Sequence, residues 1–299
     1  LDGVSVGAGV GVVEQDAKGV QVAAIGNSVR RNSRGFQGGG IFNVIGGQGR
    51  GAQIAGIVNV AKGYFKGFQA AGVVNYAKEI HGAQVGVVNV AKAQYGTQVG
   101  VVNVAGKRSA TQIGVFNVAG KRSGTQIGVF NVVGKDNEYT LGLFNFVRKG
   151  KTALTMWGDE LGFMNTGIKH GNGKWYNMYL FGYSPHAKRG SVGLAHGFRF
   201  GGSGKLFFTV DAVARGIFEK KKIFKKAPAL LASARFGVGF RVSRGLSLIV
   251  GASYNYFNNF DRDDNDLPEP FHGITMEYGS KNNDDIHWPG VFVQLDVNL

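Results

Sequence analysis

Nine asparagines recur at a nearly constant spacing through the first half of the chain. Their intervals are 16 residues three times and then 14 residues five times, at Asn27, Asn43, Asn59, Asn75, Asn89, Asn103, Asn117, Asn131 and Asn145. The phrase around each asparagine is a β-rich run of about eight residues followed by a polar turn of Gly, Lys, Arg and Ser. A unit this short cannot form a domain alone, so each unit must bury side chains against its neighbours, and the fold must be repetitive.

Two architectures are compatible with this repeat. In a parallel β-solenoid, equivalent positions stack, and the repeat ladder is Asn59, Asn75, Asn89, Asn103, Asn117, Asn131 and Asn145. In the alternative, one continuous large β-barrel of about 16 strands, each repeat is one antiparallel strand plus a turn. Because Ile113 shares a strand face with Asn117, and Phe116 shares one with Gln112, neither face is cleanly apolar. This pattern favours the solenoid.

The second half of the chain follows a two-residue alternation. From Leu230 to Val242 the even positions are apolar, while the odd positions include Ser233, Arg235 and Arg241. Similar alternation occurs at residues 206–215, 246–256 and 291–299. Each of these stretches predicts a strand with one apolar and one polar face.

The candidate connections between these strands alternate in length. Short ones fall at 170–173, 201–204 and 243–245, and longer ones at 184–190, 217–228 and 258–289. Short turns on one rim and long loops on the other are typical of outer-membrane barrels, and aromatics near the strand ends fit interfacial girdles. The final residue, Leu299, departs from the aromatic that commonly ends such barrels. Six clear strands and two more from 152–168 predict an antiparallel barrel of about eight strands.

These patterns divide the chain into three segments. We expect an N-terminal segment at 1–19, tandem 14- and 16-residue β-repeats at 20–150 and outer-membrane β-barrel strands at 151–299. Fifty Gly and five Pro agree with a turn-rich, all-β protein. The sequence contains no run of 18 apolar residues, so it predicts no transmembrane helix. The start at Leu1 lacks signal-peptide features, so we expect a mature exported form. The absence of Cys excludes disulfides and thiolate metal sites.

The chain is strongly basic. Thirty-four Lys and Arg against 19 Asp and Glu give a formal charge of +15. Such a charge raises the possibility of nucleic-acid binding, but most of it is scattered through turns such as Lys107-Arg108 and Lys121-Arg122. We therefore expect solvated turns and no nucleic-acid partner. Outer-membrane lipid and anionic glycolipid are the expected partners, together with other envelope proteins.

The repeat phrase resembles a known family. The pattern Gly-x-Gln-Ile-Gly-x-x-Asn-x-Ala, as in Gly124 to Val133, is similar to the surface-repeat proteins of Bacteroidetes and spirochaetes, where it runs in tandem ahead of a β-barrel region. The segment from Phe146-Val-Arg-Lys-Gly150 through Asn177–Gly182 also resembles their junction. The resemblance implies an outer-membrane or surface location. It implies no reaction and no catalytic residues.

Several motifs resemble sites that carry chemistry, and each is incomplete. Gly106-Lys-Arg-Ser109 departs from a phosphate-binding loop and recurs one repeat later, which indicates a turn. An acidic loop lacks the turn Gly and final Glu of a helix-loop-helix calcium site; its acidic residues are Asp261, Asp263, Asp264, Asp266 and Glu269. Asp284, Asp285 and His287 lack a second convergent cluster, and His196 lies among apolar neighbours. We therefore expect no catalytic, cofactor-binding or metal residues, and no enzyme activity.

The function expected from sequence is non-enzymatic. An integral outer-membrane β-barrel would carry a repeat module with structural or protein-docking roles in the bacterial envelope. The alternatives are a porin-like diffusion channel and, second, an outer-membrane hydrolase. The candidate outer-loop contacts are Lys220, Lys221, Lys222, Lys225, Lys226, Asp261, Asp263, Asp264 and Asp266.

Overall fold

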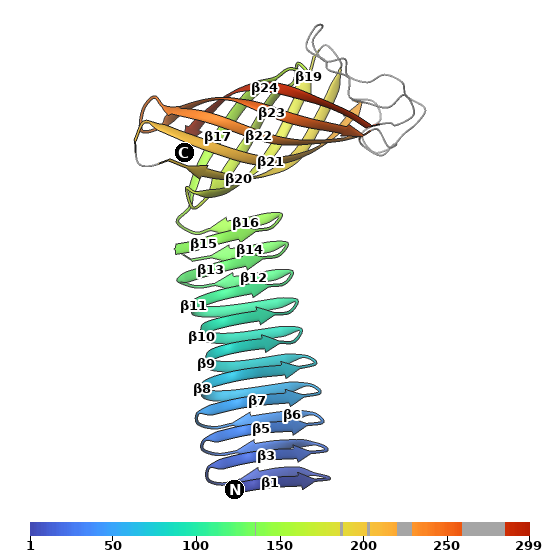
Figure 1. The fold of residues 1–299 in the computed structure, drawn as a ribbon, viewed down its shortest axis with the longest axis vertical. Coiled ribbons are helices and arrows are strands. Elements are labelled where there is room, and N and C mark those ends of the chain that lie inside the picture. The colour runs from blue at the N-terminus through green and yellow to red at the C-terminus, as the bar shows by residue number, and fades with distance from the viewer. Residues whose placement is uncertain (135, 186–187, 202–203, 220–228, 259–284) are drawn as a thin grey trace. The chain divides into compact units, whose positions relative to one another are not determined.

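The computed structural model describes residues 1–299 except for 135, 186–187, 202–203, 220–228 and 259–284. The chain forms two compact units, Leu1–Lys149 and Gly150–Leu299. Every regular element in the described residues is a β-strand (Figure 1). No helix in this part of the chain is long and apolar enough to cross a membrane.

The first unit is a parallel β-solenoid. Its strands are β1 (Asp2–Gly7), β2 (Val10–Val13), β3 (Ala17–Ala23), β4 (Gly26–Val29), β5 (Ser33–Gly39), β6 (Phe42–Ile45), β7 (Gly49–Ala55), β8 (Val58–Ala71), β9 (Val74–Val85), β10 (Val88–Val99), β11 (Val102–Ile113), β12 (Phe116–Ala119), β13 (Arg122–Ile127), β14 (Phe130–Val133), β15 (Asp136–Leu141) and β16 (Phe144–Val147). Each turn of the solenoid, here called a rung, pairs in parallel register with the next. Figure 1 shows the rungs stacked from β1 to β16.

The core of the solenoid is built from two ladders of buried amides. Asn stacks on Asn through Nδ2–H···Oδ1 bonds of 2.7–3.0 Å, each donated to the following rung. Gln stacks on Gln through bonds of 2.6–2.9 Å, each donated to the preceding rung. From Asn27 to Asn131, each Asn also donates to a backbone carbonyl on the opposite limb, as Asn117 does to Ile127 O at 2.9 Å. The ladders therefore join both neighbouring rungs and opposite limbs.

A column of glycines accompanies the Gln ladder. At Gly67, φ is 141°, and an added Cβ would lie 1.8 Å from the carbonyl oxygen of Gly51 in the rung below. Only glycine combines this backbone conformation with so close an approach. The column explains why Gly precedes Gln by two residues in most of the repeats.

The solenoid begins earlier than the repeat motif indicates. The sequence predicted a separate segment at 1–19, but β1 pairs with β3 and β2 pairs with β4 in the same register as later rungs. Ser5 stands opposite Gln21, and Gly11 stands opposite Asn27. The first rung lacks both ladder amides, so the repeat motif cannot be recognised in its sequence. Its backbone still pairs with the next rung and continues the stack.

The second unit is a closed antiparallel barrel of eight strands. These are β17 (Lys151–Asp159), β18 (Met164–Gly171), β19 (Trp175–Ser184), β20 (Arg189–Phe200), β21 (Leu206–Glu219), β22 (Ala229–Arg241), β23 (Leu246–Asn258) and β24 (Asp285–Asn298). β24 pairs with β17 and closes the barrel. The all-β prediction of a solenoid followed by an eight-stranded barrel is confirmed. The alternative of one large barrel is excluded because the repeats pair in parallel in their own sheet.

The two rims of the barrel differ in their connections. On the short-turn rim, β18–β19, β20–β21 and β22–β23 are joined by residues 172–174, 201–205 and 242–245. On the long-loop rim, the connections are residues 160–163, 185–188, 220–228 and 259–284. β17 starts at the short-turn rim, because Lys151 pairs with Gly171, and Leu299 ends there through a bond from its N–H to Thr152 O at 2.9 Å.

The amide ladder predicts the cost of a single substitution in the solenoid. Asn117→Ala removes the acceptor of one Asn103 Nδ2–H and the donor to Asn131 Oδ1, which leaves two buried polar groups each short of a ladder bond. Ile127 O loses the bond from Asn117 but keeps the bond from Gly114 N–H at 3.0 Å. At about 1–3 kcal/mol per orphaned group, we expect the solenoid to lose about 2 kcal/mol or more. Pulse proteolysis across a urea series measures this loss. Thr111→Ala, at a partly exposed position of the neighbouring limb, is the matched control, and equal midpoints for both variants would contradict the ladder's role.

Candidate functional site

The barrel lumen contains a buried polar network, which is the candidate site. Charged and amide side chains from several strands point inward and are largely buried. They are Asp159, Asn165, Lys169, Asp211, Arg215, Arg235, Asn255, Gln294 and Asp296. Their strands are antiparallel neighbours, so alternate residues of each strand reach the lumen.

Two ion pairs cross the lumen at hydrogen-bond distance. Lys169 Nζ lies 2.9 Å from Asp296 Oδ2, with both side chains nearly inaccessible to solvent. Arg215 NH1 lies 2.9 Å from Asp159 Oδ2 and the same distance from Asn165 Oδ1. Pairing and additional hydrogen bonds offset the cost of removing these charges from water.

Arg235 occupies the centre of the network. It donates to Gln294 Oε1 at 2.5 Å, and its guanidinium carbon lies 3.7 Å from the centroid of the Phe292 ring. Asp211 Oδ2 lies 4.0 Å from its Nε, and Asp211 also accepts a hydrogen bond from Tyr176 Oη. Amide, aromatic and carboxylate groups thus surround this arginine on several sides.

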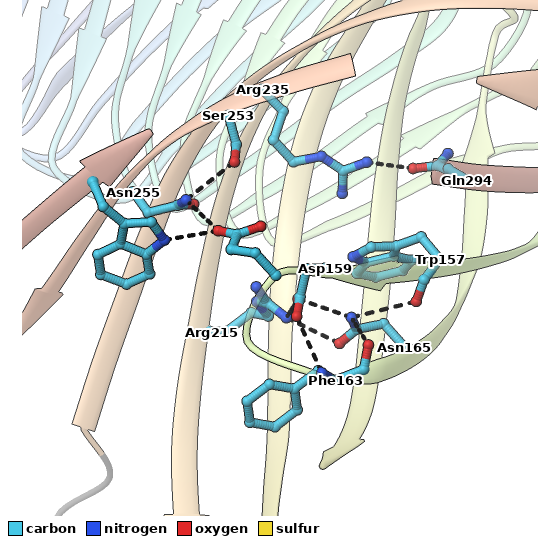
Figure 2. A network of polar contacts seen from close by, with 11 residues as sticks. Trp157, Asp159, Phe163, Asn165, Arg215, Arg235, Ser253, Asn255 and Gln294 are labelled. Atoms are coloured by element: carbon cyan, nitrogen blue, oxygen red, sulfur yellow. Dashed lines mark hydrogen bonds and ion pairs between the residues drawn. The ribbon is translucent and has the colours of Figure 1, made fainter. Parts of the chain in front are cut away.

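A small cavity lies beside Arg235 and Arg215. Its volume is about 10 Å³, which is room for about one water molecule. Polar atoms of its lining residues have no hydrogen-bond partner among the described residues: Glu160 Oε2, Arg215 Nε, Ser233 Oγ, Arg235 Nε and Arg235 NH1. On one side, Glu160 Oε1 accepts bonds from Asn255 Nδ2 at 2.7 Å and Trp288 Nε1 at 2.8 Å (Figure 2). The cavity suits a bound water better than a substrate.

The remainder of the lumen is filled by apolar and aromatic side chains. A buried cluster comprises Trp157, Tyr176, Met178, Leu180, Ala195, Phe207, Val213, Ile249 and Phe292. Eight-stranded barrels have an interior just wide enough for side chains to fill. The lumen is therefore packed, and the described residues line no pore.

The outer face of the barrel is apolar. At the positions of β17 to β23 that point outward there is no Asp, Glu, Lys or Arg, and the same holds for β24 from His287 onward. Exposed outward side chains include Met156, Ile168, Phe181, Val192, Val210, Phe236, Val238, Phe240, Val250, Tyr254, Val291 and Val293. Polar side chains facing inward and apolar ones outward are the arrangement of an outer-membrane β-barrel.

A row of polar side chains interrupts this apolar face near the short-turn rim. His196 Nδ1 lies 3.0 Å from Asn177 Oδ1, and its ring stacks on Trp175. Thr152 Oγ1 lies 2.8 Å from His170 Nδ1. His196 therefore packs against Trp175 and Asn177 on the outer face of the barrel.

The sequence-derived site residues fall into two groups. The repeat-ladder asparagines are all in the solenoid core and are buried. The candidate contacts Lys220, Lys221, Lys222, Lys225, Lys226, Asp261, Asp263, Asp264 and Asp266 lie outside the described residues, as do Asp284 and the rest of the acidic loop. His287 lies against the rings of Tyr254 and Tyr256.

The lumen network itself was not predicted as a site. Its members are separated by up to 128 residues in the chain, as Glu160 and Trp288 are. A signal did exist, because Asp211, Arg215 and Arg235 occupy the polar positions of alternating strands. What the alternation could not supply was the strand register that brings Asp159 to Arg215 and Lys169 to Asp296.

No protein-family model and no curated protein matches the chain. Among solved structures, the chain is similar to the crystal structure of Neisserial surface protein A (NspA), with a TM-score of 0.30 and 10% sequence identity. The similarity covers 50% of this chain and 94% of that chain. A likeness this weak says nothing about shared function.

The apolar outer face of the barrel predicts that a charged substitution there lowers the stability of the barrel more than one in the lumen does. Phe236 lies midway along β22 and is 47% exposed, so a lysine there would place a charge in hydrocarbon at a cost of about 2–4 kcal/mol. Ser233→Asp is the comparison, because Ser233 faces the lumen cavity that Arg215 and Arg235 also line. Urea unfolding in lipid vesicles measures both variants. Equal stability of the two would contradict a lipid-facing role for Phe236.

The buried ion pair predicts a second outcome. Lys169→Met removes the cation from Asp296, which also accepts a hydrogen bond from Gln294 Nε2 at 2.8 Å. Breaking a buried pair costs about 3–5 kcal/mol, whereas replacing both partners by apolar groups is often neutral. We expect Lys169→Met to lower the temperature at which the barrel loses its compact mobility on SDS gels, and the double variant Lys169→Met with Asp296→Leu to recover it. An unshifted single variant contradicts the pair's contribution.

Proposed function

We propose that this chain is an integral outer-membrane protein whose barrel is an anchor, and whose solenoid contacts other components of the envelope without catalysis. The observation that carries the proposal is the division of side chains in the barrel. Every charged side chain within the described strands faces the lumen or lies at a strand end, and the outward positions form an apolar surface. An apolar belt of this kind is stable in hydrocarbon and costly in water.

The filled lumen supports an anchoring role over a channel. A diffusion channel was plausible if the repeats enlarged the barrel, but the barrel closes with eight strands and the repeats form their own sheet. Buried ion pairs and the aromatic cluster occupy the lumen. Aqueous channels are a property of much larger barrels.

The topology of the barrel supports a periplasmic location for the solenoid. Outer-membrane barrels turn their short connections toward the periplasm and their long loops outward. Residues 148–150 connect the last solenoid strand to β17, which starts at the short-turn rim. The resemblance to surface-repeat proteins implies a surface location, but connectivity supports the inner side of the membrane for the repeats. The strand ends that flank residues 220–228 and 259–284 then face outward.

This proposal predicts opposite accessibility for two engineered cysteines. The chain has no native Cys, so Lys107→Cys, at an exposed position of β11, and Lys222→Cys, between β21 and β22 in the sequence, each carry a single thiol. In intact cells, a membrane-impermeant maleimide should label Lys222→Cys and leave Lys107→Cys unlabelled until the outer membrane is permeabilised. Labelling of Lys107→Cys in intact cells contradicts the periplasmic location. Release of the protein from membranes without detergent contradicts membrane integration.

A further inference from the structure

The solenoid has an inverted distribution of polar and apolar side chains. Its interior holds the Asn and Gln ladders, all with less than 4% of their surface exposed, beside a small apolar cluster that includes Phe65 and Ile80. Its exterior holds Val, Ile, Leu and Phe at most outward positions of both faces. A soluble β-solenoid buries large apolar side chains in its core. Large exposed apolar patches mark surfaces that contact proteins or membranes.

The apolar exterior is continuous along one edge. The turn between the Gln-containing and Asn-containing strands places one apolar side chain per rung outward, with 38–48% exposure at Ile25, Ile41, Ile57, Val73, Val87, Val101, Val115 and Leu143. The adjacent column on one face is equally exposed, at Val22, Ile54, Val85, Val99, Ile113, Ile127 and Leu141. On the other face, Phe116, Val118, Val132, Phe144 and Phe146 are exposed. We call the turn column the apolar edge.

The charges of the solenoid lie on the opposite edge. Sixteen Lys and Arg against six Asp and Glu give residues 1–149 a formal charge of +10. In the sequence, all sixteen cations lie in the part of the repeat that runs from the Asn position to the next Gln position. This part includes the middle of the continuous strands β8 to β11, where Lys62, Lys78 and Lys92 lie. Lys62, Lys78 and Lys92 are exposed, stack in successive rungs and have no ion-pair partner among the described residues. We call this side the cationic edge.

The separation of the two edges matches the depth of a lipid leaflet. Lys18 on the cationic edge and Ile25 on the apolar edge are seven residues apart in the sequence. An extended strand of that length spans about 23 Å at about 3.3 Å per residue. Half of a bilayer with its headgroups is roughly 20–22 Å. A solenoid whose apolar edge lay at the bilayer midplane would therefore hold its cationic edge at the level of the phosphates.

We propose that the solenoid inserts its apolar edge into one leaflet of the bilayer that the barrel spans, with its cationic edge on anionic headgroups. This inference rests on the proposed membrane location of the barrel. Charge complementarity selects the occupant, because each Lys or Arg near an anionic surface contributes roughly 1 kcal/mol. A second copy of the solenoid is a poorer match for the cationic edge, because it carries sixteen Lys and Arg against six Asp and Glu.

Depth measurements on the full-length protein in anionic phospholipid vesicles test the proposal. Spin labels are attached to single cysteines in three variants: Val101→Cys on the apolar edge, Lys107→Cys on the cationic edge and Phe236→Cys on the barrel. The first rung presents unpaired backbone groups, so the solenoid positions are taken from the central rungs. We expect the Val101→Cys label, like that of Phe236→Cys, to collide more often with dissolved oxygen than with an aqueous nickel complex. The Lys107→Cys label should show the reverse order.

Each other result has a defined meaning. A Val101→Cys label that is readily reached by nickel overturns leaflet insertion, and the Phe236→Cys label shows whether the barrel itself has inserted. A Val101→Cys label that neither reagent reaches, with spin–spin coupling between copies, overturns it in favour of self-association. If the proposal holds, replacing Lys62, Lys78 and Lys92 together by Gln reduces the oxygen preference of the Val101→Cys label. Replacing the same three by Arg preserves it, and equal effects of the two triple variants overturn the headgroup contact.

Discussion

The hydrogen-bonded stacking of identical amides is the interaction on which the solenoid depends. From Asn43 to Asn131, each asparagine donates to an amide and to a carbonyl and accepts from the rung before, so a buried polar group is fully partnered. This works only if every rung presents an amide at the same place, and the strict sequence period follows from that requirement. The Asn and Gln ladders donate in opposite directions along the stack. Their side-chain dipoles therefore oppose one another, which limits the net dipole of a long array.

Filling the interior with amides has a consequence for the exterior. Asn, Gln and Ala share the space between the limbs with a few large apolar side chains such as Phe65 and Ile80, and the other large apolar side chains occupy outward positions. The barrel also combines a polar network with an apolar cluster inside, and it presents apolar side chains such as Phe236 outside. Both units thus hold polar networks inside and expose many large apolar side chains outside. A hydrocarbon environment gives a single physical reason for both, because it favours apolar exteriors and requires polar groups to be satisfied internally.

Much of this fold could be predicted from sequence because its rules are local. The spacing of asparagines defined the rungs, and alternation from Leu230 to Val242 correctly assigned Phe236 to the outside and Arg235 to the lumen. The first rung escaped detection because Ser5 and Gly11 stand where Gln and Asn would mark it. The lumen network escaped because strand register is a long-range property, and a shift of two residues would preserve the pattern while separating Lys169 from Asp296.

The segregation of charge along the solenoid is not a requirement of its folding. Either turn would solvate a lysine equally well in water, since both edges are exposed, and the amide ladders are indifferent to which turn carries it. Yet the apolar turn carries no Lys or Arg in any rung, while the other turn carries most of them. A uniform aqueous surrounding gives no reason for such a bias over ten rungs. Surroundings that differ between the two edges would explain the bias. A lipid leaflet provides them, because it changes from hydrocarbon to anionic headgroups over this distance.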